Sequence, residues 1–327
     1  MDSPTLYRDI LKRAWSVTKN HTHLWVLGFL AALLGNGGEF EFILTQFNKL
    51  SSGTITFGQG VLTTLGTGGS NIVQYAVGLL VKSGENHAMF AVFSVILIVS
   101  IWLVVSSQGA LIRAIAASSA NSGIGSLKGH FLAGNSSFWH LLSILVFTRL
   151  GAFFILGVIG LPLFVILMYW IDPIKSLFLV IFVLGLPLFI IASLISKYAV
   201  AFRMLENKKW KQSITSALSL FFDHWLVSIE LALILFLVNI IVGAVILVVV
   251  LIFAVPFILL SYFIQSAASG IFLWIGQVLA FLLLLLLGSI LATFQYASWT
   301  ELFLKIRKGK HLSKILRTIT HFREIYR

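Results

Sequence analysis

Residues 231–300 contain no Asp, Glu, Lys or Arg, and this uncharged stretch constrains the fold more than any other feature of the chain. At ~1.5 Å of rise per residue, one helix of that length would far exceed the ~30 Å hydrocarbon core of a bilayer. The chain must therefore cross a membrane here, turn and cross back. The composition agrees, because 59% hydrophobic and only 10% charged residues are far from the usage of a soluble domain.

Further apolar runs predict the other transmembrane helices. Clear segments of sufficient length occupy residues 88–112, 138–170, 176–196, 225–256 and 271–299. A weaker first span begins at Leu24 and is continuously apolar only to Gly35. We interpret it as a retained anchor rather than a signal peptide, because a long charged region precedes it. The chain is therefore predicted to be an all-α membrane protein of about six transmembrane helices. Residues 225–262 could hold one span or two, and one span bent at Pro256 is preferred.

The distribution of Lys and Arg predicts the orientation of these helices. One side of the membrane receives the cations of residues 8–19, 113–128, 197–211 and 305–327, and the other receives only Lys49, Lys82 and Lys175. Cytoplasmic loops are enriched in Lys and Arg, so we expect a multi-pass protein of the cell membrane with both termini in the cytoplasm. The net charge of +12 is assigned to these juxtamembrane cations, and nucleic acid is not predicted as a partner.

Three segments on the basic side combine apolar and basic residues at helical spacing. In the first, the apolar residues Ile10, Ala14 and Val17 alternate with basic residues between positions 8 and 19. The others are residues 208–222 and residues 312–326, which lie in a basic cytoplasmic tail, 306–327. We expect these helices to lie in the membrane interface as anchors, where they could bind anionic lipid or a protein partner.

The sequence also contains a weak internal repeat. Each unit opens with His and Trp at the basic interface, at residues 23–25, 139–141 and 224–226. Each closes with small or aromatic residues, at 108–113, 198–203 and 295–299. The simplest description is a single membrane domain, residues 1–327, of three tandem hairpins, each led by an interfacial amphipathic helix. The units would be about 1–116, 117–207 and 208–305.

Local patterns in this layout resemble a known family. They are residues 10–15 (ILKRAW), 24–29 (LWVLGF) and 198–205 (YAVAFRML) followed by 208–214 (KKWKQSI). These runs are similar to the membrane domain attached to some bacterial glycerophosphoryl diester phosphodiesterases and to stand-alone relatives of that domain. The resemblance covers most of the chain. It implies a bacterial cytoplasmic-membrane protein of six or so helices, and it implies little about activity.

Motifs that carry enzyme chemistry are missing from the sequence. There is no H-E-x-x-H zinc motif, no G-x-S-x-G nucleophile turn and no nucleotide-binding loop. Cys is absent, and His21 with His23 is too small a set for a metal site. We therefore predict a protein that is not an enzyme and has no cofactor. The preferred function is a non-catalytic scaffold or membrane-assembly component, and the alternative is a carrier or channel for a small solute or lipid.

Polar residues inside the predicted spans are the candidate functional positions. Arg149 is the only charge in residues 139–170, and Glu230 is the only charge in residues 225–299. A lone Arg near the midplane costs roughly 2.5 to 3.5 kcal/mol, so we expect Arg149 to pair with Glu230. Alternatively, Arg149 faces a water-filled path and binds an anionic solute or lipid headgroup. Asn239 adds an amide to the membrane interior.

A second candidate is the polar run that interrupts the first span, formed by Asn36, Gly37, Gly38, Glu39 and Glu41. Either the helix ends at Gly35 and the two acids are solvated near the outer interface, or the acids line a cavity inside the protein. The second possibility would match the discontinuous helices of carriers.

Overall fold

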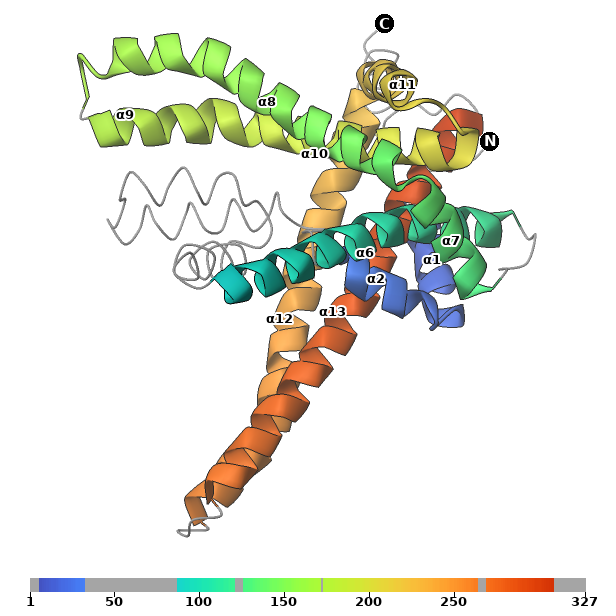
Figure 1. The fold of residues 1–327 in the computed structure, drawn as a ribbon, viewed down its shortest axis with the longest axis vertical. Helices are drawn as coiled ribbons and strands as arrows, with labels where there is room; N and C mark the ends of the chain where they lie inside the picture. The colour runs from blue at the N-terminus through green and yellow to red at the C-terminus, as the bar shows by residue number, and fades with distance from the viewer. Residues whose placement is uncertain (1–5, 33–86, 121–125, 172, 264–268, 309–327) are drawn as a thin grey trace, which may run out of the picture. The chain divides into compact units, whose positions relative to one another are not determined.

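The computed structural model describes residues 6–32, 87–120, 126–171, 173–263 and 269–308 (Figure 1). The regular structure within these residues is helical, and no strand occurs among them. Five segments are long and apolar enough to cross a membrane: Ser94–Ser119, Phe138–Leu167, Ile181–Glu206, Trp225–Phe263 and Gly270–Lys308. The predicted class, an all-α protein with several transmembrane helices, is confirmed to this extent.

These five segments correspond to the five clear apolar runs of the sequence. Four of them lie in single helices: α6 (His87–Ser119), α8 (Phe138–Leu167), α12 (Trp225–Phe263) and α13 (Ser269–Lys308). The fifth combines the π-helix η1 (Ile181–Gly185) with α10 (Leu186–Glu206) and follows α9 (Pro173–Val180). α12 continues through Pro256, so residues 225–262 form one helix. Of the weaker first span only α2 (Leu24–Ala32) is described, and the polar run 36–41 lies outside the described residues.

The chain separates into two compact units, Met1–Phe29 with Leu226–Arg327, and Leu30–Trp225. In the first unit α1 (Leu6–Asn20) packs against α13, and Trp15 contacts Phe294 edge to face with ring centroids 6.2 Å apart. The start of α2 also lies against α13. A Cβ added to Gly28 would be 2.0 Å from Thr293 Oγ1 and 2.8 Å from the Ser289 carbonyl oxygen, so only glycine permits this approach.

The second unit contains α6, α7 (Leu127–Ser136), α8, α9, η1, α10 and α11 (Trp210–Asp223). In Figure 1, α8 runs antiparallel to the α9–α10 segment, and these helices are in contact. α7 lies so close to α6 that a Cβ on Gly134 would be 2.1 Å from the Ser106 carbonyl oxygen. Trp102 Nε1 donates to Asn135 Oδ1 across this contact at 2.8 Å. α11 packs against α10 and α8, and Trp210 stacks on Phe147 at 4.7 Å.

The short helices α1, α7 and α11 share one packing arrangement. α7 lies against α6 and α11 lies against α10, which in each case is the long helix just before it in the chain. α1 packs against the long helix α13, the last of the described helices. Each short helix buries a small residue, namely Ala14, Gly134 or Ala217. A small residue lets two helix backbones approach closely, which makes the contact area large for so short a helix.

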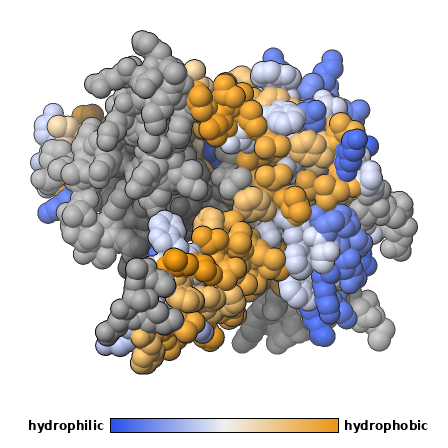
Figure 2. Space-filling model, turned by 60° about the horizontal axis from the view of Figure 1, so that its bottom comes forward, coloured by the Kyte–Doolittle hydropathy of each residue, from blue (hydrophilic) through white to orange (hydrophobic). Residues whose placement is uncertain are grey.

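Burial is uneven along the long helices of the first unit. α13 is buried without interruption from Ala292 to Phe303, whereas most of its side chains between Ile271 and Leu286 are exposed. α12 has no buried residue beyond Leu235. Apolar side chains accordingly cover much of the coloured surface in Figure 2. In a protein that crosses a bilayer, such uncovered apolar stretches are the parts that lipid chains cover.

Candidate functional site

Arg149 and Glu230, which the sequence predicts to be a pair, belong to different units and have different environments. Arg149 lies on α8 and is exposed, whereas Glu230 lies on α12 and is 8% exposed. The Glu230 carboxylate accepts a hydrogen bond from the hydroxyl of Tyr7 on α1. Tyr7 was not among the residues singled out in the sequence, because nothing in a linear pattern places α1 beside the start of α12. The pairing of Arg149 with Glu230 stays a prediction.

Asn239, the third polar position predicted from the sequence, bonds to the other long helix of its unit. Gln295 Nε2 on α13 donates to Asn239 Oδ1 on α12 at 2.5 Å. Gln295 is 7% exposed. This hydrogen bond joins two helices that are otherwise apolar over most of their length, and it satisfies the Gln295 amide donor and the Asn239 amide oxygen.

A second polar link joins α8 and α10. Thr148 Oγ1 and Ser196 Oγ are 2.5 Å apart, and both residues are buried. Thr148 Oγ1 also donates to the Ile144 carbonyl oxygen one turn earlier, at 2.8 Å. These two hydroxyl groups are therefore satisfied by each other and by the helix backbone.

A third polar contact joins α2 and α6, and some of its buried polar groups have no hydrogen-bond partner. Gln108 Nε2 on α6 donates to the carbonyl oxygen of Ala31 on α2 at 3.5 Å. Next to Gln108, the hydroxyls of Ser106 and Ser107 are fully buried and have no hydrogen-bond partner. Other serines of α6 do bond to the helix backbone: Ser100 Oγ donates to the Ile96 carbonyl at 2.7 Å and Ser119 Oγ to the Ile115 carbonyl at 3.1 Å.

The three links occupy comparable positions in the predicted repeat. Its closing runs align Gln108, Tyr198 and Gln295. Two residues earlier, the same alignment places Ser106, Ser196 and Thr293 together. Ser196 bonds to Thr148, and Thr293 Oγ1 donates to the Ser289 carbonyl at 2.8 Å. Ser106 alone of these three hydroxyls has no partner.

Ser106, Ser107 and Gln108 are positions that our sequence analysis missed as a site. They are three consecutive polar residues at the centre of the span Ser94–Ser119. They also lie five to seven residues before Arg113, so at ~1.5 Å per residue they are roughly 8 to 10 Å from the basic end of the predicted span 88–112. That clustering was visible in the sequence. Serines in a helix normally bond to their own backbone, however, so the sequence does not show that these two do not.

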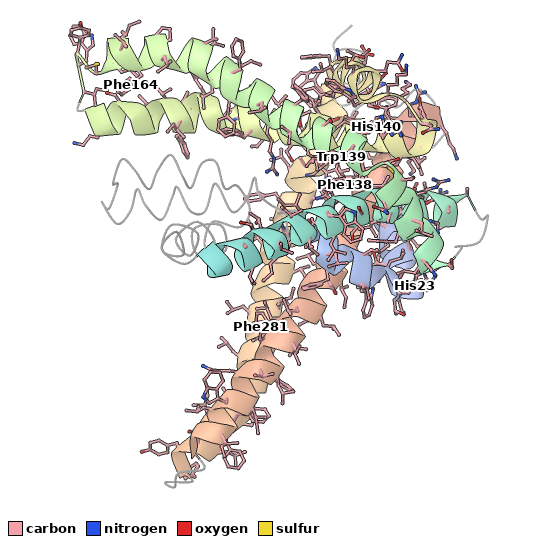
Figure 3. All side chains as sticks on the ribbon, viewed as in Figure 1. His23, Phe138, Trp139, His140, Phe164 and Phe281 are labelled. Carbon is pink, nitrogen blue, oxygen red and sulfur yellow. The ribbon has the colours of Figure 1, made fainter. Side chains whose placement is uncertain are left out.

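The basic ends of the helices carry the remaining ionisable groups of interest. Figure 3 shows His23 beside the start of α2 and His140 at the start of α8, whereas Phe164 and Phe281 lie on the apolar parts of α8 and α13. Partial burial lowers the pKa of His23 from its usual value of 6.5, and the nearby His21 lowers it further. Among the described residues, no three His, Asp or Glu side chains gather in a way that could hold a metal ion.

The comparisons with known proteins give no relative from which a function could be transferred. No protein-family model matches the chain, and neither a curated protein nor a solved structure is similar to it.

Proposed function

We propose that this protein is a non-catalytic scaffold or assembly component of a bacterial cytoplasmic membrane, with both termini in the cytoplasm. The observation that supports this proposal best is the packing of α1. Its apolar residues Ile10, Ala14 and Val17 are buried, while Arg8, Lys12, Arg13 and Lys19 are all exposed. α1 is thus held by the protein through one side and presents its cations on the other.

The charges of α1 fit the phosphate groups of anionic lipid. The only acid in α1 is Asp9, and its carboxylate lies 3.9 Å from Lys305 Nζ on α13. Each Lys or Arg close to an anionic leaflet contributes about 1 kcal/mol of attraction, so four cations on one short helix make a strong electrostatic anchor. Trp15, half exposed on the same helix, suits the headgroup level. A protein partner with an acidic surface could dock there as well.

The repeat completes the proposal. Three tandem hairpins, at about residues 1–116, 117–207 and 208–305, would each be led by an amphipathic helix at the inner face, in the manner of the membrane domain of the glycerophosphoryl diester phosphodiesterases. The common packing of α1, α7 and α11 supports this description. Single cysteines test the topology, since the chain has none of its own. An impermeant maleimide should label S269C but not S213C in intact cells, and the reverse result would contradict the orientation.

The lipid proposal is tested by neutralising the cations of α1. We expect R8Q/K12Q/R13Q/K19Q to retain less phosphatidylglycerol, relative to phosphatidylcholine, when the protein is purified from mixed lipid and its bound lipid is measured by mass spectrometry. The matched control is S16A/N20A, which changes exposed residues of the same helix without altering its charge. Equal phosphatidylglycerol retention by the wild type and the four-fold variant would contradict the proposal.

The pairing of Arg149 with Glu230 would add a link between the second and third hairpins. Tyr7 already donates to the Glu230 carboxylate, and a carboxylate has room for further donors. If the pair forms, R149L and E230L should each lower stability, and the double variant should recover much of the loss. Additive losses would favour the alternative, in which Arg149 binds an anionic solute or headgroup.

A carrier or channel is the second candidate function, and one observation favours it. Gln108 of α6 donates to the Ala31 carbonyl of α2 beside two buried serine hydroxyls that have no partner, and polar groups within spans are the groups that carriers use to bind solutes. Purified protein in liposomes with a panel of solutes separates the two functions. Accumulation of a solute above that of protein-free liposomes would favour the carrier over the scaffold.

A further inference from the structure

We propose that Lys209, Trp210 and Lys211 at the start of α11, together with the exposed face of α8 that begins at Phe147, bind one anionic phospholipid of the inner leaflet. This inference extends the lipid proposal made for α1 to a second site, and it rests on the same orientation of the chain. All of the residues of this site belong to the second unit.

Ring contacts attach the start of α11 to α8. Trp210 stacks on Phe147 with ring centroids 4.7 Å apart and an angle of 18° between the ring planes. Lys211 Nζ lies 5.3 Å from the centroid of the Trp210 ring. A cation over an aromatic ring is attracted by the negative face of the ring, so Trp210 holds the Lys211 ammonium group beside α8. The start of α11 therefore presents positive charge next to the surface of the long helix.

The three lysines at this position have different roles. Lys208 Nζ is 3.1 Å from the Glu206 carboxylate and donates to Ser216 Oγ at 3.0 Å, so Lys208 links α10 to α11. Lys209 and Lys211 are exposed instead. The first turn of α11 contains no acid that could neutralise them. These two cations therefore fit the phosphate of an anionic headgroup, which Lys binds as a point charge.

An apolar surface of α8 begins directly at these cations. Phe147, Leu150, Phe154 and Val158 are spaced by three or four residues and so form one stripe along the helix. Each of them is more than half exposed. A different face of α8, where Thr148 is buried, packs against α10. The stripe is thus an uncovered surface that starts where Phe147 meets Trp210.

The length of α8 places these groups at the level of phospholipid headgroups. The last charged residue of α8 is Arg149, and the uncharged residues 150–167 are about 27 Å long at ~1.5 Å per residue. This length is close to the ~30 Å thickness of the hydrocarbon core. Tyr169 and Trp170 follow at the far end and are largely exposed, as aromatic residues at a membrane interface are. Phe147 and the start of α11 therefore lie at the near interface.

Charge and apolar surface together select a phospholipid. The stripe from Phe147 to Val158 is about 16 Å long, which is close to the ~15 Å thickness of one leaflet of the core. An inorganic phosphate ion would match the two lysines but not the stripe. A second copy of this chain would bring a net charge of +12 to a basic surface. An anionic phospholipid matches both parts, with its phosphate at Lys209 and Lys211 and an acyl chain along α8.

The test uses a phosphatidylglycerol probe with a diazirine in the middle of an acyl chain, added to liposomes that contain the full chain. A phosphatidylcholine probe with the same acyl chain is the reference, and mass spectrometry of peptides locates the crosslinked residues. We expect the phosphatidylglycerol probe to crosslink to residues 147–158 about 5- to 25-fold more than the phosphatidylcholine probe. The reason is that each Lys near an anionic headgroup contributes roughly a factor of five.

Variants of the two lysines should remove this preference. K209Q/K211Q should lower the phosphatidylglycerol yield on residues 147–158 to the phosphatidylcholine yield, whereas K209R/K211R keeps both charges and should keep the preference. The matched control is K12Q/K19Q, which removes two exposed lysines from α1 and should leave the crosslinking to α8 unchanged. All of these side chains except the phenyl ring contacts of Trp210 are left in place, so each variant should unfold at the temperature of the wild type.

The proposal is overturned if the two probes crosslink equally to residues 147–158, if K209Q/K211Q keeps the preference, or if K12Q/K19Q loses it as completely. It is also overturned if neither probe reaches these residues, because a second copy of the chain or another protein would then cover the stripe. The α1 proposal is tested by total retention of phosphatidylglycerol in R8Q/K12Q/R13Q/K19Q rather than by a crosslinked position. Failure of the α8–α11 site therefore leaves the α1 proposal standing.

Discussion

The α8–α10 and α12–α13 helix pairs differ from the α2–α6 pair in how they satisfy their buried polar groups. In the first two, a polar side chain of one long helix bonds to a polar side chain of the other, as Ser196 does with Thr148 and Gln295 does with Asn239. In the α2–α6 pair, Gln108 reaches only a backbone carbonyl of α2, and two neighbouring hydroxyls are unpartnered.

This difference shows that the presence of a polar residue within a span does not reveal whether its side chain has a hydrogen-bond partner. Ser196 and Thr293 have hydrogen-bond partners, whereas Ser106, at the aligned position of the first repeat unit, has none. A satisfied pair stabilises the helix contact, whereas a buried hydroxyl without a partner does not contribute to it. The comparison between these helix pairs can be tested first at the contact of α7 with α6.

The largest expected effect comes from Gly134, which fixes α7 against the backbone of α6 at Ser106. G134V should destabilise the protein by about 2 to 3 kcal/mol, because its Cβ would overlap the Ser106 carbonyl oxygen and the helices must separate. The control is G151A on α8, where no atom lies within 4 Å of the added Cβ and the helix should gain about 0.5 to 1 kcal/mol. Unfolding in detergent measures both. A neutral G134V would mean that the α6–α7 contact is not close in solution.

A smaller effect should separate Ser196 from Ser106. S196A removes a satisfied partner of Thr148 and should cost about 1 kcal/mol in the free energy of unfolding. S106A removes a buried hydroxyl without a partner and should cost close to nothing. Unfolding of the purified protein measures both, and a larger loss in S106A than in S196A would contradict the contrast between the helix pairs.

The amide pair of α12 and α13 should show a coupling of about 0.6 to 1.7 kcal/mol in a double-mutant cycle. N239L and Q295L each leave one amide unpaired in an apolar environment, whereas N239L/Q295L leaves none. The double variant should therefore be more stable than the sum of the single losses predicts. Strictly additive losses would show that the 2.5 Å contact contributes no interaction energy.

The smallest expected effect is a pH dependence that belongs to the connection between α1 and α2. The pKa of His23 is lowered in the folded protein, mainly by partial burial and then by His21, so the folded state binds its proton less readily than the unfolded state. Stability should therefore fall as the pH drops through about 6.5 and below, and H23Q should flatten this slope.

Much of the fold could be predicted from the sequence because the bilayer restricts what an apolar chain can do. Runs such as 138–170 and 271–299 must become helices, since only helices and closed barrels satisfy their backbone groups in hydrocarbon. The continuous helix α12 likewise follows from an apolar run that Pro256 does not end. Exposure of the basic face of α1 also agrees with its helical pattern.

The candidate site was only partly predictable. Arg149, Glu230 and Asn239 stand out because each is a rare polar residue in an apolar run, and that rarity is a property of the sequence. The hydrogen-bond partners of these residues cannot be recognised in the sequence. Tyr7 lies 223 residues before Glu230 and Gln295 lies 56 residues after Asn239, and no local rule connects positions so far apart.

By itself, then, the sequence determined that the chain is helical, that it crosses a membrane several times and where its cations gather, because these properties depend on the chemistry of consecutive residues. Which helix meets which was decided only in the tertiary structure. Packing between different helices places α1 on α13 and brings Gly134 close to Ser106. The same packing leaves the hydroxyls of Ser106 and Ser107 without partners. Whether a buried hydroxyl finds a hydrogen-bond partner depends on the side chains and backbone that surround it, and those come from distant parts of the chain.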